Sequence, residues 1–186
     1  VNSGLIDKQH AVFAKLGKIT SEGYREHSQV DLSSYFLGTV RFDKDMTTRF
    51  HFFGGPLSDE LAYYGLPKFV NEDLNLRRWN PSENLYDVDS TGKAFSYFVP
   101  RRPQEQESFF QPHYELLNEW RLTPSLTLYN TLFYYTGEGA FDFDASWADT
   151  STLRIGSTWG IPATENPSNT LVRAFVGNKQ FGWLPR

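Results

Sequence analysis

The sequence contains no cysteine, a single methionine and no long apolar run. The absence of cysteine excludes disulfide-stabilised scaffolds and metal sites built on thiolates. Because no segment approaches about 18 consecutive apolar residues, the sequence predicts no transmembrane helix. The chain begins Val1-Asn2-Ser3, without a basic and apolar leader, so if the protein is exported we expect its start to be missing.

The chain also lacks a large excess of either sign of charge, with 18 basic and 22 acidic residues and a net charge of -4. This balance argues against nucleic acid as a partner, because such proteins neutralise many phosphates with Lys and Arg. Aromatic residues are abundant, at 17% of the chain, although only 39% of all residues are hydrophobic. A chain that is both aromatic and polar is typical of an outer-membrane barrel, and equally of a carbohydrate-binding β-sandwich.

The clearest pattern is a strict alternation between Phe109 and Leu122. Successive side chains of a strand point to opposite faces, so this segment has one apolar face and one charged face. The apolar face carries Phe110, Tyr114, Leu116, Trp120 and Leu122. The other face carries Gln111, His113, Glu115, Glu119 and Arg121. Ten residues at about 3.3 Å, tilted by about 40°, span on the order of 25 Å, which matches the apolar band of a transmembrane barrel.

Similar alternation predicts further strands, about six in all. Their expected ranges are about 8–20, 30–42, 47–55, 109–122, 126–137 and 178–184. Short turns at 43–45 and 123–125 alternate with long irregular regions at about 54–108 and 138–176, the first with a possible short strand at 95–99. Outer-membrane barrels show this asymmetry of short and long connections. The fold class is therefore predicted to be all-β and antiparallel.

The hairpin 109–137 has a predicted register. If Leu122 opposes Leu126, then Trp120 meets Leu128, Leu116 meets Leu132 and Tyr114 meets Tyr134 on one face, with Asn118 opposite Asn130 as a polar exception. A register shifted by one residue would turn Tyr129 and Phe133 outward instead. Which face of each strand meets lipid stays open at this point.

Several strings, taken in order along the chain, resemble the TonB-dependent outer-membrane receptors. They are Ser3-Gly4-Leu5, Ser21-Glu22-Gly23-Tyr24-Arg25, Asp31-Leu32-Ser33-Ser34-Tyr35-Phe36-Leu37, Gly54-Gly55 with Ala62-Tyr63-Tyr64-Gly65-Leu66-Pro67, Phe110-Gln111-Pro112-His113-Tyr114-Glu115-Leu116, Gly137-Glu138-Gly139-Ala140-Phe141-Asp142, and Leu171-Val172-Arg173 with Asn178-Lys179-Gln180-Phe181-Gly182. The sequence departs from the family at Glu22 and Glu26, where aspartate is common, and at Pro56-Leu57-Ser58, where a Lys-Glu pair is usual. These departures concern the ligand rather than the fold.

The resemblance implies that residues 1–186 form an internal part of a transmembrane β-barrel of about 22 strands. The family's plug domain, TonB box and C-terminal strands have no counterpart here. We expect that about six strands alone do not form a stable membrane protein, because open edges leave backbone groups unpaired in lipid. By resemblance, the whole protein would be an active transporter in the Gram-negative outer membrane. It would import a scarce ligand, most often a ferric siderophore, driven by the TonB–ExbB–ExbD complex acting on the plug.

The residues predict neither an enzyme nor a cofactor or metal site. The four histidines, His10, His27, His51 and His113, are dispersed and show no metal-ligand spacing. No serine lies in a nucleophile elbow, and no glycine pattern fits a dinucleotide site. His51 and His113 are expected to face the barrel lumen.

Candidate ligand-binding residues lie in the long region after 54. They are Tyr63, Tyr64, Arg77, Arg78 and Trp79. Aromatic rings and arginines together suit an anionic iron chelate, through cation–π contacts and charge-assisted hydrogen bonds. The alternative is that these side chains only pack the loop.

Two other classes of protein remain open. A soluble β-sandwich binding module would bury its aromatics on one sheet face and would lack the alternation of short turns and long loops. A passive porin would share the barrel but would have no plug.

Overall fold

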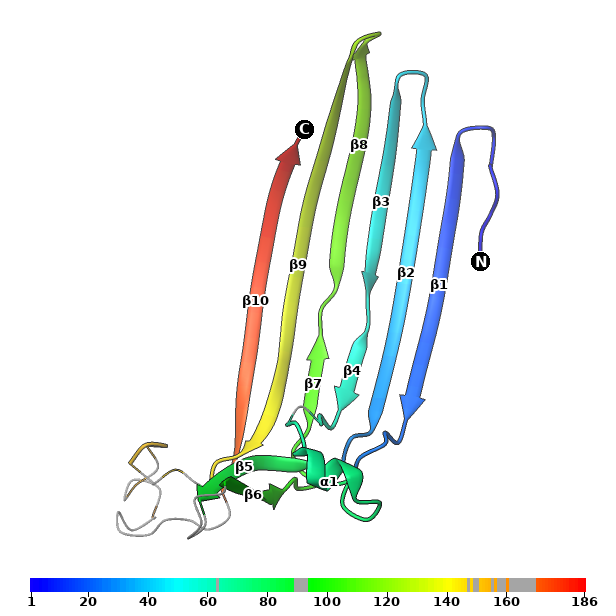
Figure 1. The fold of residues 1–186 in the computed structure, drawn as a ribbon. Coiled ribbons are helices and arrows are strands. Elements are labelled where there is room, and N and C mark those ends of the chain that lie inside the picture. Colours follow the sequence, from blue (N-terminus) through cyan, green and yellow to red (C-terminus); the bar gives the residue numbers. More distant parts are fainter. Residues whose placement is uncertain are drawn as a thin grey trace.

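The computed structural model describes residues 1–62, 64–88, 94–146, 148, 151–154, 156, 160 and 170–186, with the side chains of 83–88 and 94–99 left aside. Long antiparallel strands form one sheet, and a two-stranded sheet and a short helix lie beside one end of it (Figure 1). The elements are β1 His10–Ser21, β2 Val30–Phe42, β3 Met46–Gly54, β4 Pro56–Asp59, α1 Lys68–Glu72, β5 Pro81–Val88, β6 Ala94–Pro100, β7 Glu107–Phe110, β8 His113–Thr123, β9 Leu126–Asp144 and β10 Leu171–Pro185.

The main sheet contains eight strands, but two pairs of them lie end to end. β3 and β4 both pair with β2, on either side of Gly55, and β7 and β8 both pair with β9, on either side of Gln111 and Pro112. The neighbours across the sheet are therefore β1, β2, β3 with β4, β8 with β7, β9 and β10, all antiparallel. This confirms the predicted all-β antiparallel fold.

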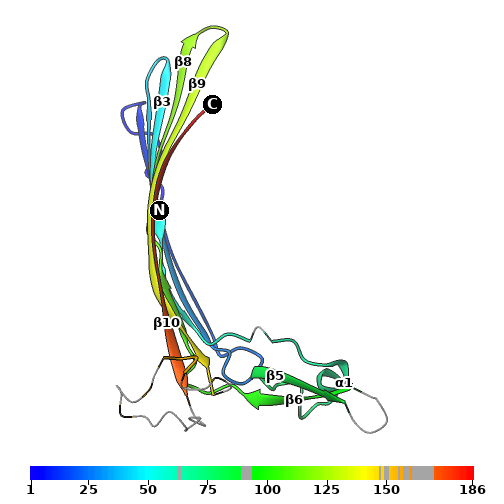
Figure 2. The ribbon, with the colours of Figure 1, turned by 90° about the vertical axis from the view of Figure 1, so that its left-hand side faces the viewer.

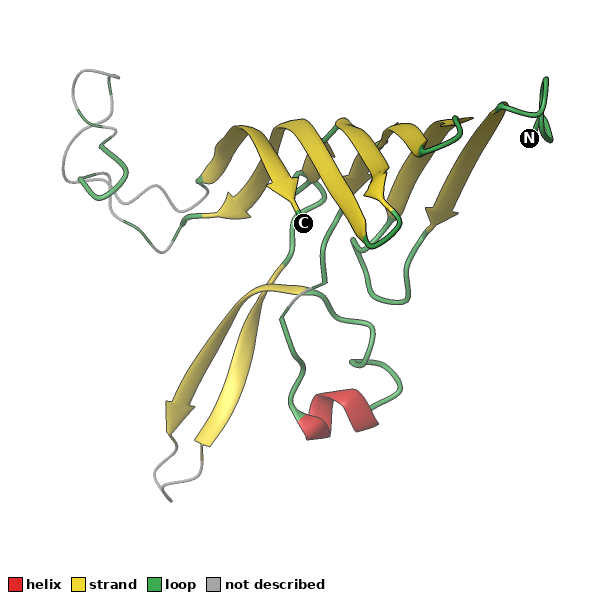
Figure 3. Cartoon of the chain, turned by 90° about the horizontal axis from the view of Figure 1, so that it is seen from above, coloured by secondary structure: helices red, strands yellow, loops and turns green. Residues whose placement is uncertain are grey.

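The connections are strongly unequal at the two ends of the sheet (Figure 1). The turns at 43–45 and 124–125 lie at one end, and the connections that follow β1, β4 and β9 leave from the other. The connection after β4 carries α1 and the β5–β6 hairpin, which project to one side of the sheet (Figures 2 and 3). Within the described residues, no helix has the length and apolar character needed to cross a membrane. The alternation of short and long connections follows the prediction.

Two strands, β9 and β10, are longer than the sequence predicts, and the strand predicted at 109–122 is divided into β7 and β8 at Gln111 and Pro112. The prediction that residues 138–176 are irregular is wrong at both ends, because β9 continues to Asp144 and β10 already begins at Leu171. The region 54–108 likewise contains β4, α1, β5 and the start of β7, in addition to β6, which covers the short strand expected at 95–99. The continuation of β9 was not predicted because glycine interrupts the alternating pattern there. A Cβ atom at Gly139 would collide with the ring of Phe109 on β7, so only glycine fits beside that ring.

The predicted hairpin register is confirmed along the strands but is wrong at the turn, where Leu126 pairs with Thr123 in place of Leu122 because the ladder is irregular between Arg121 and Thr123. Trp120 pairs with Leu128, Leu116 with Leu132 and Tyr114 with Tyr134. Asn118 and Asn130 oppose each other as expected. Asn118 Nδ2 donates a hydrogen bond of 3.1 Å to Thr48 Oγ1, and Asn130 Oδ1 accepts one of 3.1 Å from Trp183 Nε1. The two amides therefore each find a partner on the neighbouring strand.

One side of the sheet, which we name the apolar face, carries Leu116 and Tyr134. Along β1 it holds no charged residue between His10 and Lys18, and along β2 none between Arg41 and Asp31. The side chains of this uncharged zone are Val12, Ala14, Leu16, Ser33, Tyr35, Leu37, Thr39, Phe50, Phe52, Tyr114, Leu116, Leu132, Tyr134, Phe181 and Trp183. On β10 the zone ends at Lys179, which lies on the same face opposite Thr136. Eight residues at about 3.3 Å cover on the order of 25 Å along a strand.

The opposite side, which we name the mixed face, carries His51 and His113. It also bears the charged residues Lys15, Arg49, Glu115, Glu119 and Arg121. Register places Phe36 and Val40 of β2 on this face, so the more apolar side of β2 joins the charged side of β3. His51 Nδ1 lies 3.3 Å from Glu115 Oε2.

Rows of rings cross several strands on each face. On the apolar face, the ring of Phe52 lies 4.9 Å from Tyr35 and 4.8 Å from Tyr114. On the mixed face, the ring of His113 stacks 4.8 Å from Phe53 and 4.9 Å from Tyr135. Such cross-strand aromatic pairs each stabilise a sheet by roughly 0.2–1 kcal/mol and fix its register.

The close contact at Gly139 leads to the first prediction. Gly139→Ala should destabilise the protein by about 1–3 kcal/mol, because the added methyl group has to displace Phe109 or the backbone of β7. Gly65→Ala is the matched control, since no atom lies within 4 Å of the added Cβ there. Urea unfolding in detergent micelles measures both free energies of unfolding. Equal stability of the two variants would contradict the described packing of β7 on β9.

Candidate functional site

The connection between β1 and β2 docks onto the long connection that follows β4. The backbone N–H of Glu26 donates to the carbonyl of Arg78 at 2.8 Å, and that of Glu60 donates to the carbonyl of Gln29 at 2.9 Å. Arg25 Nη1 donates to the carbonyl of Tyr64 at 2.5 Å. Two loops that are distant in sequence therefore form one structure at the loop end of the sheet.

The predicted ligand-binding residues divide into two groups. Tyr63 lies outside the described residues. Arg77 and Arg78 both lie against Tyr24, with each guanidinium carbon 5.8 Å from the ring centroid, and Arg78 Nε donates to the carbonyl of Tyr24 at 3.1 Å. This arrangement uses both arginines to hold the loops together, which is the packing role that the sequence left as the alternative.

Trp79 belongs to a second feature, a hollow of about 260 Å³ between the two loops. The indole is 38% exposed, so part of it remains open to a ligand. The residues that line the hollow are Glu26, His27, Trp79, Asn80, Pro81, Pro100 and Arg101. We name this the Trp79 hollow.

Asn80 is buried in the wall of the Trp79 hollow and is 4% exposed. Its Nδ2 atom donates to the carbonyl of His27 at 2.6 Å and faces the carbonyl of Leu61 at 3.3 Å. Two carbonyl acceptors fix the orientation of the amide, because only the NH₂ group can donate to them. The Oδ1 atom is left with no hydrogen-bond partner among the described residues. An unpaired buried acceptor is uncommon and requires an explanation.

Arg101 is also buried, at 4% exposure. Its charge acts on two carboxylates on neighbouring strand ends, Asp59 of β4 and Glu107 of β7, which are partners in the register. Burial raises the pKa of Asp59, and Arg101 opposes this effect. Burial and the nearby charge of Asp59 raise the pKa of Glu107, again opposed by Arg101. The guanidinium is thus held near two acidic groups on the sheet side.

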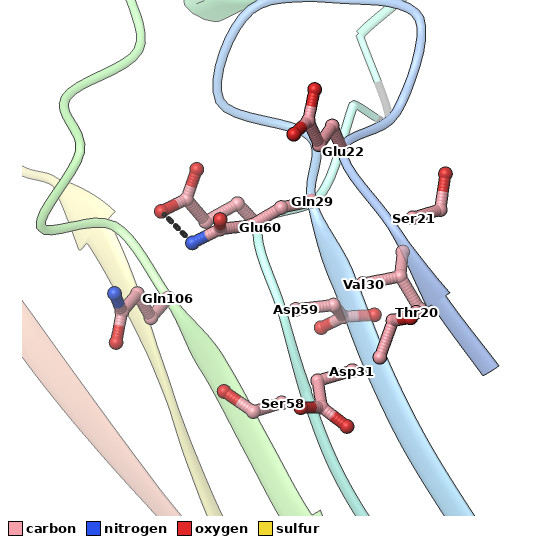
Figure 4. Close-up of a pocket in the computed structure, with 10 residues that line it drawn as sticks. All are labelled: Thr20, Ser21, Glu22, Gln29, Val30, Asp31, Ser58, Asp59, Glu60 and Gln106. Atoms are coloured by element: carbon pink, nitrogen blue, oxygen red, sulfur yellow. Dashed lines mark hydrogen bonds between the residues drawn. The ribbon is translucent and has the colours of Figure 1, made fainter. Parts of the chain in front are cut away.

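A larger acidic hollow of about 480 Å³ lies at the ends of β1, β2 and β4 (Figure 4). Its carboxylates are Glu22, Asp31, Asp59 and Glu60. Two of them have partners within the protein: Lys18 Nζ lies 3.2 Å from Asp31 Oδ2, and Gln29 Nε2 donates to Glu60 Oε1 at 2.9 Å. In the part of the chain that the structure describes, no three His, Cys, Asp or Glu side chains are grouped as a metal site.

A buried carboxylate, that of Glu105, attaches the chain before β7 to the end of β9. Glu105 is 1% exposed and accepts hydrogen bonds from the backbone N–H groups of Arg102 at 2.7 Å and Asp144 at 3.0 Å. On the apolar face beyond the uncharged zone, Arg173 binds Asp142 through two hydrogen bonds of 2.7 and 2.9 Å. The hydrogen bond from Arg173 holds the pKa of Asp142 below its usual range. These contacts fix the base of the loops.

The sequence did not indicate Tyr24, Asn80 or Arg101 as site residues. Asn80 precedes Pro81, a dipeptide that marks a turn, but this signal does not reveal burial. Arg101 lies in a proline-rich segment with no periodicity, so its contact with carboxylates of β4 and β7 depends on tertiary structure.

A scan against family models and searches of curated proteins and of solved structures found no match to the chain.

The carboxylate pair of β4 and β7 gives a pH prediction. Because the folded-state pKa values of Asp59 and Glu107 are raised, the charged forms of these groups disfavour the folded protein. Their contribution to stability is therefore fully present below the unfolded-state pKa values, about 3.9 and 4.3. It is lost as the pH rises through the folded-state pKa values. Glu107→Gln removes one charge of the pair. Its free energy of unfolding should therefore exceed that of the wild type at pH 7, by no more than about 1 kcal/mol because both groups keep contact with water, and the difference should shrink toward pH 4.

Urea titrations at pH 4 and pH 7 measure this difference. Glu72→Gln, on the surface of α1, removes the same charge far from the pair and controls for net charge. A Glu107→Gln variant that is less stable than the wild type at pH 7 would show that Glu107 is stabilised by its charge.

Proposed function

We propose that the chain forms part of the wall of a transmembrane β-barrel in a bacterial outer membrane, of the TonB-dependent receptor type. The observation that carries the proposal is the uncharged zone of the apolar face, which crosses β1, β2, β3, β8 and β9 and ends on β10 at Lys179. Lipid favours uncharged side chains over about 25 Å of height, of which the zone, at a strand tilt of about 40°, would cover roughly 20 Å. A water-filled lumen accepts the charged groups of the mixed face. Residues beyond the zone, such as Lys18, Asp31 and Glu138, would lie at the membrane surface.

Two polar groups at the edge of the uncharged zone, on the side of the short turns, support the same assignment. Asn118 and Asn130 make hydrogen bonds to Thr48 and Trp183, so their amides would not remain fully unpaired in hydrocarbon. A soluble β-sandwich would instead cover the apolar face with a second sheet. Over the described residues, the only other sheet is the β5–β6 hairpin, which lies at the loop end (Figure 1).

The transport function extends this proposal and rests on the family resemblance. The barrel wall would provide the passage, and the docked loops would form part of the extracellular capture surface for a ferric siderophore. Release and import would be driven by the TonB–ExbB–ExbD complex through a plug domain. No covalent chemistry is required of this chain.

Site-directed spin labelling tests the orientation of the two faces. The chain has no cysteine, so Leu116→Cys and Leu117→Cys each give a single labelling site on opposite faces of β8. In lipid bilayers, the label at 116 should be accessible to oxygen and protected from a water-soluble nickel chelate. The label at 117 should show the reverse, because it would face the lumen.

The outcomes separate the candidate classes. Two labels that are both protected from oxygen and nickel would indicate a soluble sandwich with a covered apolar face. Two labels that are both exposed to nickel would show that the sheet does not enter the bilayer. Either result would overturn the membrane proposal.

Binding of an iron chelate tests the capture surface. The double variant Arg77→Gln/Arg78→Gln should bind ferric tris-catecholate at least about tenfold more weakly than the wild type, because two charge-assisted hydrogen-bond donors are lost. Tyr24→Leu keeps both charges but removes the ring against which they lie, so it reports the effect of loop docking alone. Lys68→Gln removes an exposed charge from α1 of the same connection and should leave the affinity unchanged. Equal losses in the double variant and in Tyr24→Leu would assign the arginines to loop packing only.

A further inference from the structure

The Trp79 hollow has features that the import function does not explain. It is separate from the surface formed by Arg77 and Arg78 against Tyr24, and it contains a buried amide oxygen without a partner. We propose that the hollow binds one neutral sugar ring, with the indole of Trp79 as a wall and Asn80 Oδ1 as a hydrogen-bond acceptor. The proposal does not depend on which ligand the barrel imports.

The charges around the hollow favour a neutral ligand. Arg101 and Glu26 contribute opposite charges to the lining, and Arg101 already interacts with Asp59 and Glu107. The side chain of His27 faces a further carboxylate, with Nδ1 3.8 Å from Glu60 Oε2. A charged ligand would add an uncompensated charge to this balanced set, which is unfavourable in a partly desolvated site.

The unpaired oxygen of Asn80 has almost no accessible surface, so a ligand hydroxyl would donate to it after a small shift of the wall of the hollow. The amide cannot rotate to satisfy it, because Nδ2 is held by the carbonyls of His27 and Leu61. A buried acceptor left unpaired costs about 1–3 kcal/mol, so a ligand hydroxyl that donates to it is favoured over an apolar group. Sugar hydroxyls are donors and acceptors at once, and can therefore also accept from cationic side chains.

The remaining lining is apolar and rigid. Trp79 and Pro100 contribute an indole and a pyrrolidine ring, which are surfaces suited to the C–H face of a ring, and Pro81 is buried in the wall. Binding pockets commonly combine such apolar walls with a few placed polar groups. The volume of about 260 Å³ is at the small end for ligand sites, which suits one ring rather than a chain of rings.

Saturation-transfer NMR tests the proposal on the purified protein in a detergent without a sugar head group. The probes are the methyl glycosides of glucose, galactose, mannose and N-acetylglucosamine, with tetramethylammonium and methyl sulfate as charged probes. At least one glycoside should receive saturation, and neither ion should do so. Trp79→Ala should weaken glycoside binding by about tenfold, since it removes one stacking wall.

Two further variants keep the test decisive. Phe69→Ala removes an aromatic ring of α1 that is 57% exposed and does not line the hollow, so it should leave binding unchanged. Trp79→Phe keeps an aromatic wall and should bind more tightly than Trp79→Ala, which excludes a loss caused by misfolding. The absence of glycoside binding, equal binding by wild type and Trp79→Ala, or binding of an ion in place of a glycoside would each overturn the proposal.

Discussion

A sheet that is one layer thick has no interior in which to bury its side chains. Among the described residues, the buried hydrophobic residues are only Val70, Ala145 and Ala148, and all three lie outside the long strands. Leu16 and Phe181 are 85% and 86% exposed. The hydrophobic effect that normally stabilises a domain must therefore come from contact with something beyond this sheet. Every other property of the structure, from the division of its faces to the buried polar contacts of its loops, depends on this constraint.

Polar contacts provide much of the order at the loop end, where few of the described side chains are both apolar and buried. The carboxylate of Glu105 joins two backbone segments, and the amide of Asn80 joins two loops. Buried groups of this kind specify one arrangement strongly, because each alternative arrangement leaves a donor or acceptor unpaired. The backbone ladder performs the same role in the sheet. Loops built this way are fixed at their bases while their outer surfaces remain free to vary.

The strands and the hairpin register could be predicted because they depend on local alternation. Phe109 to Leu122 reveals its two faces without any knowledge of its neighbours, and Trp120 opposite Leu128 follows from the short turn. The extension of β9 past Gly137 could not be predicted, because glycine removes the alternating signal where Phe109 needs space. The site was harder still. Tyr64, Arg77 and Arg78 were identified by residue type, but their contacts with Arg25 and Tyr24 arise only when two distant loops dock.

Docking of the loops has an energetic consequence for any ligand. Ordering a loop on binding costs roughly 0.5–1.5 kcal/mol for each immobilised side chain, and this reduces affinity. Here the cost is met during folding, through the contacts of Glu26 with Arg78 and of Asn80 with His27. A surface so prepared can bind a small ligand with few contacts, which is what a hollow of about 260 Å³ offers. The single-layer sheet thus supplies a rigid support, and the polar loop contacts convert that support into a preorganised surface.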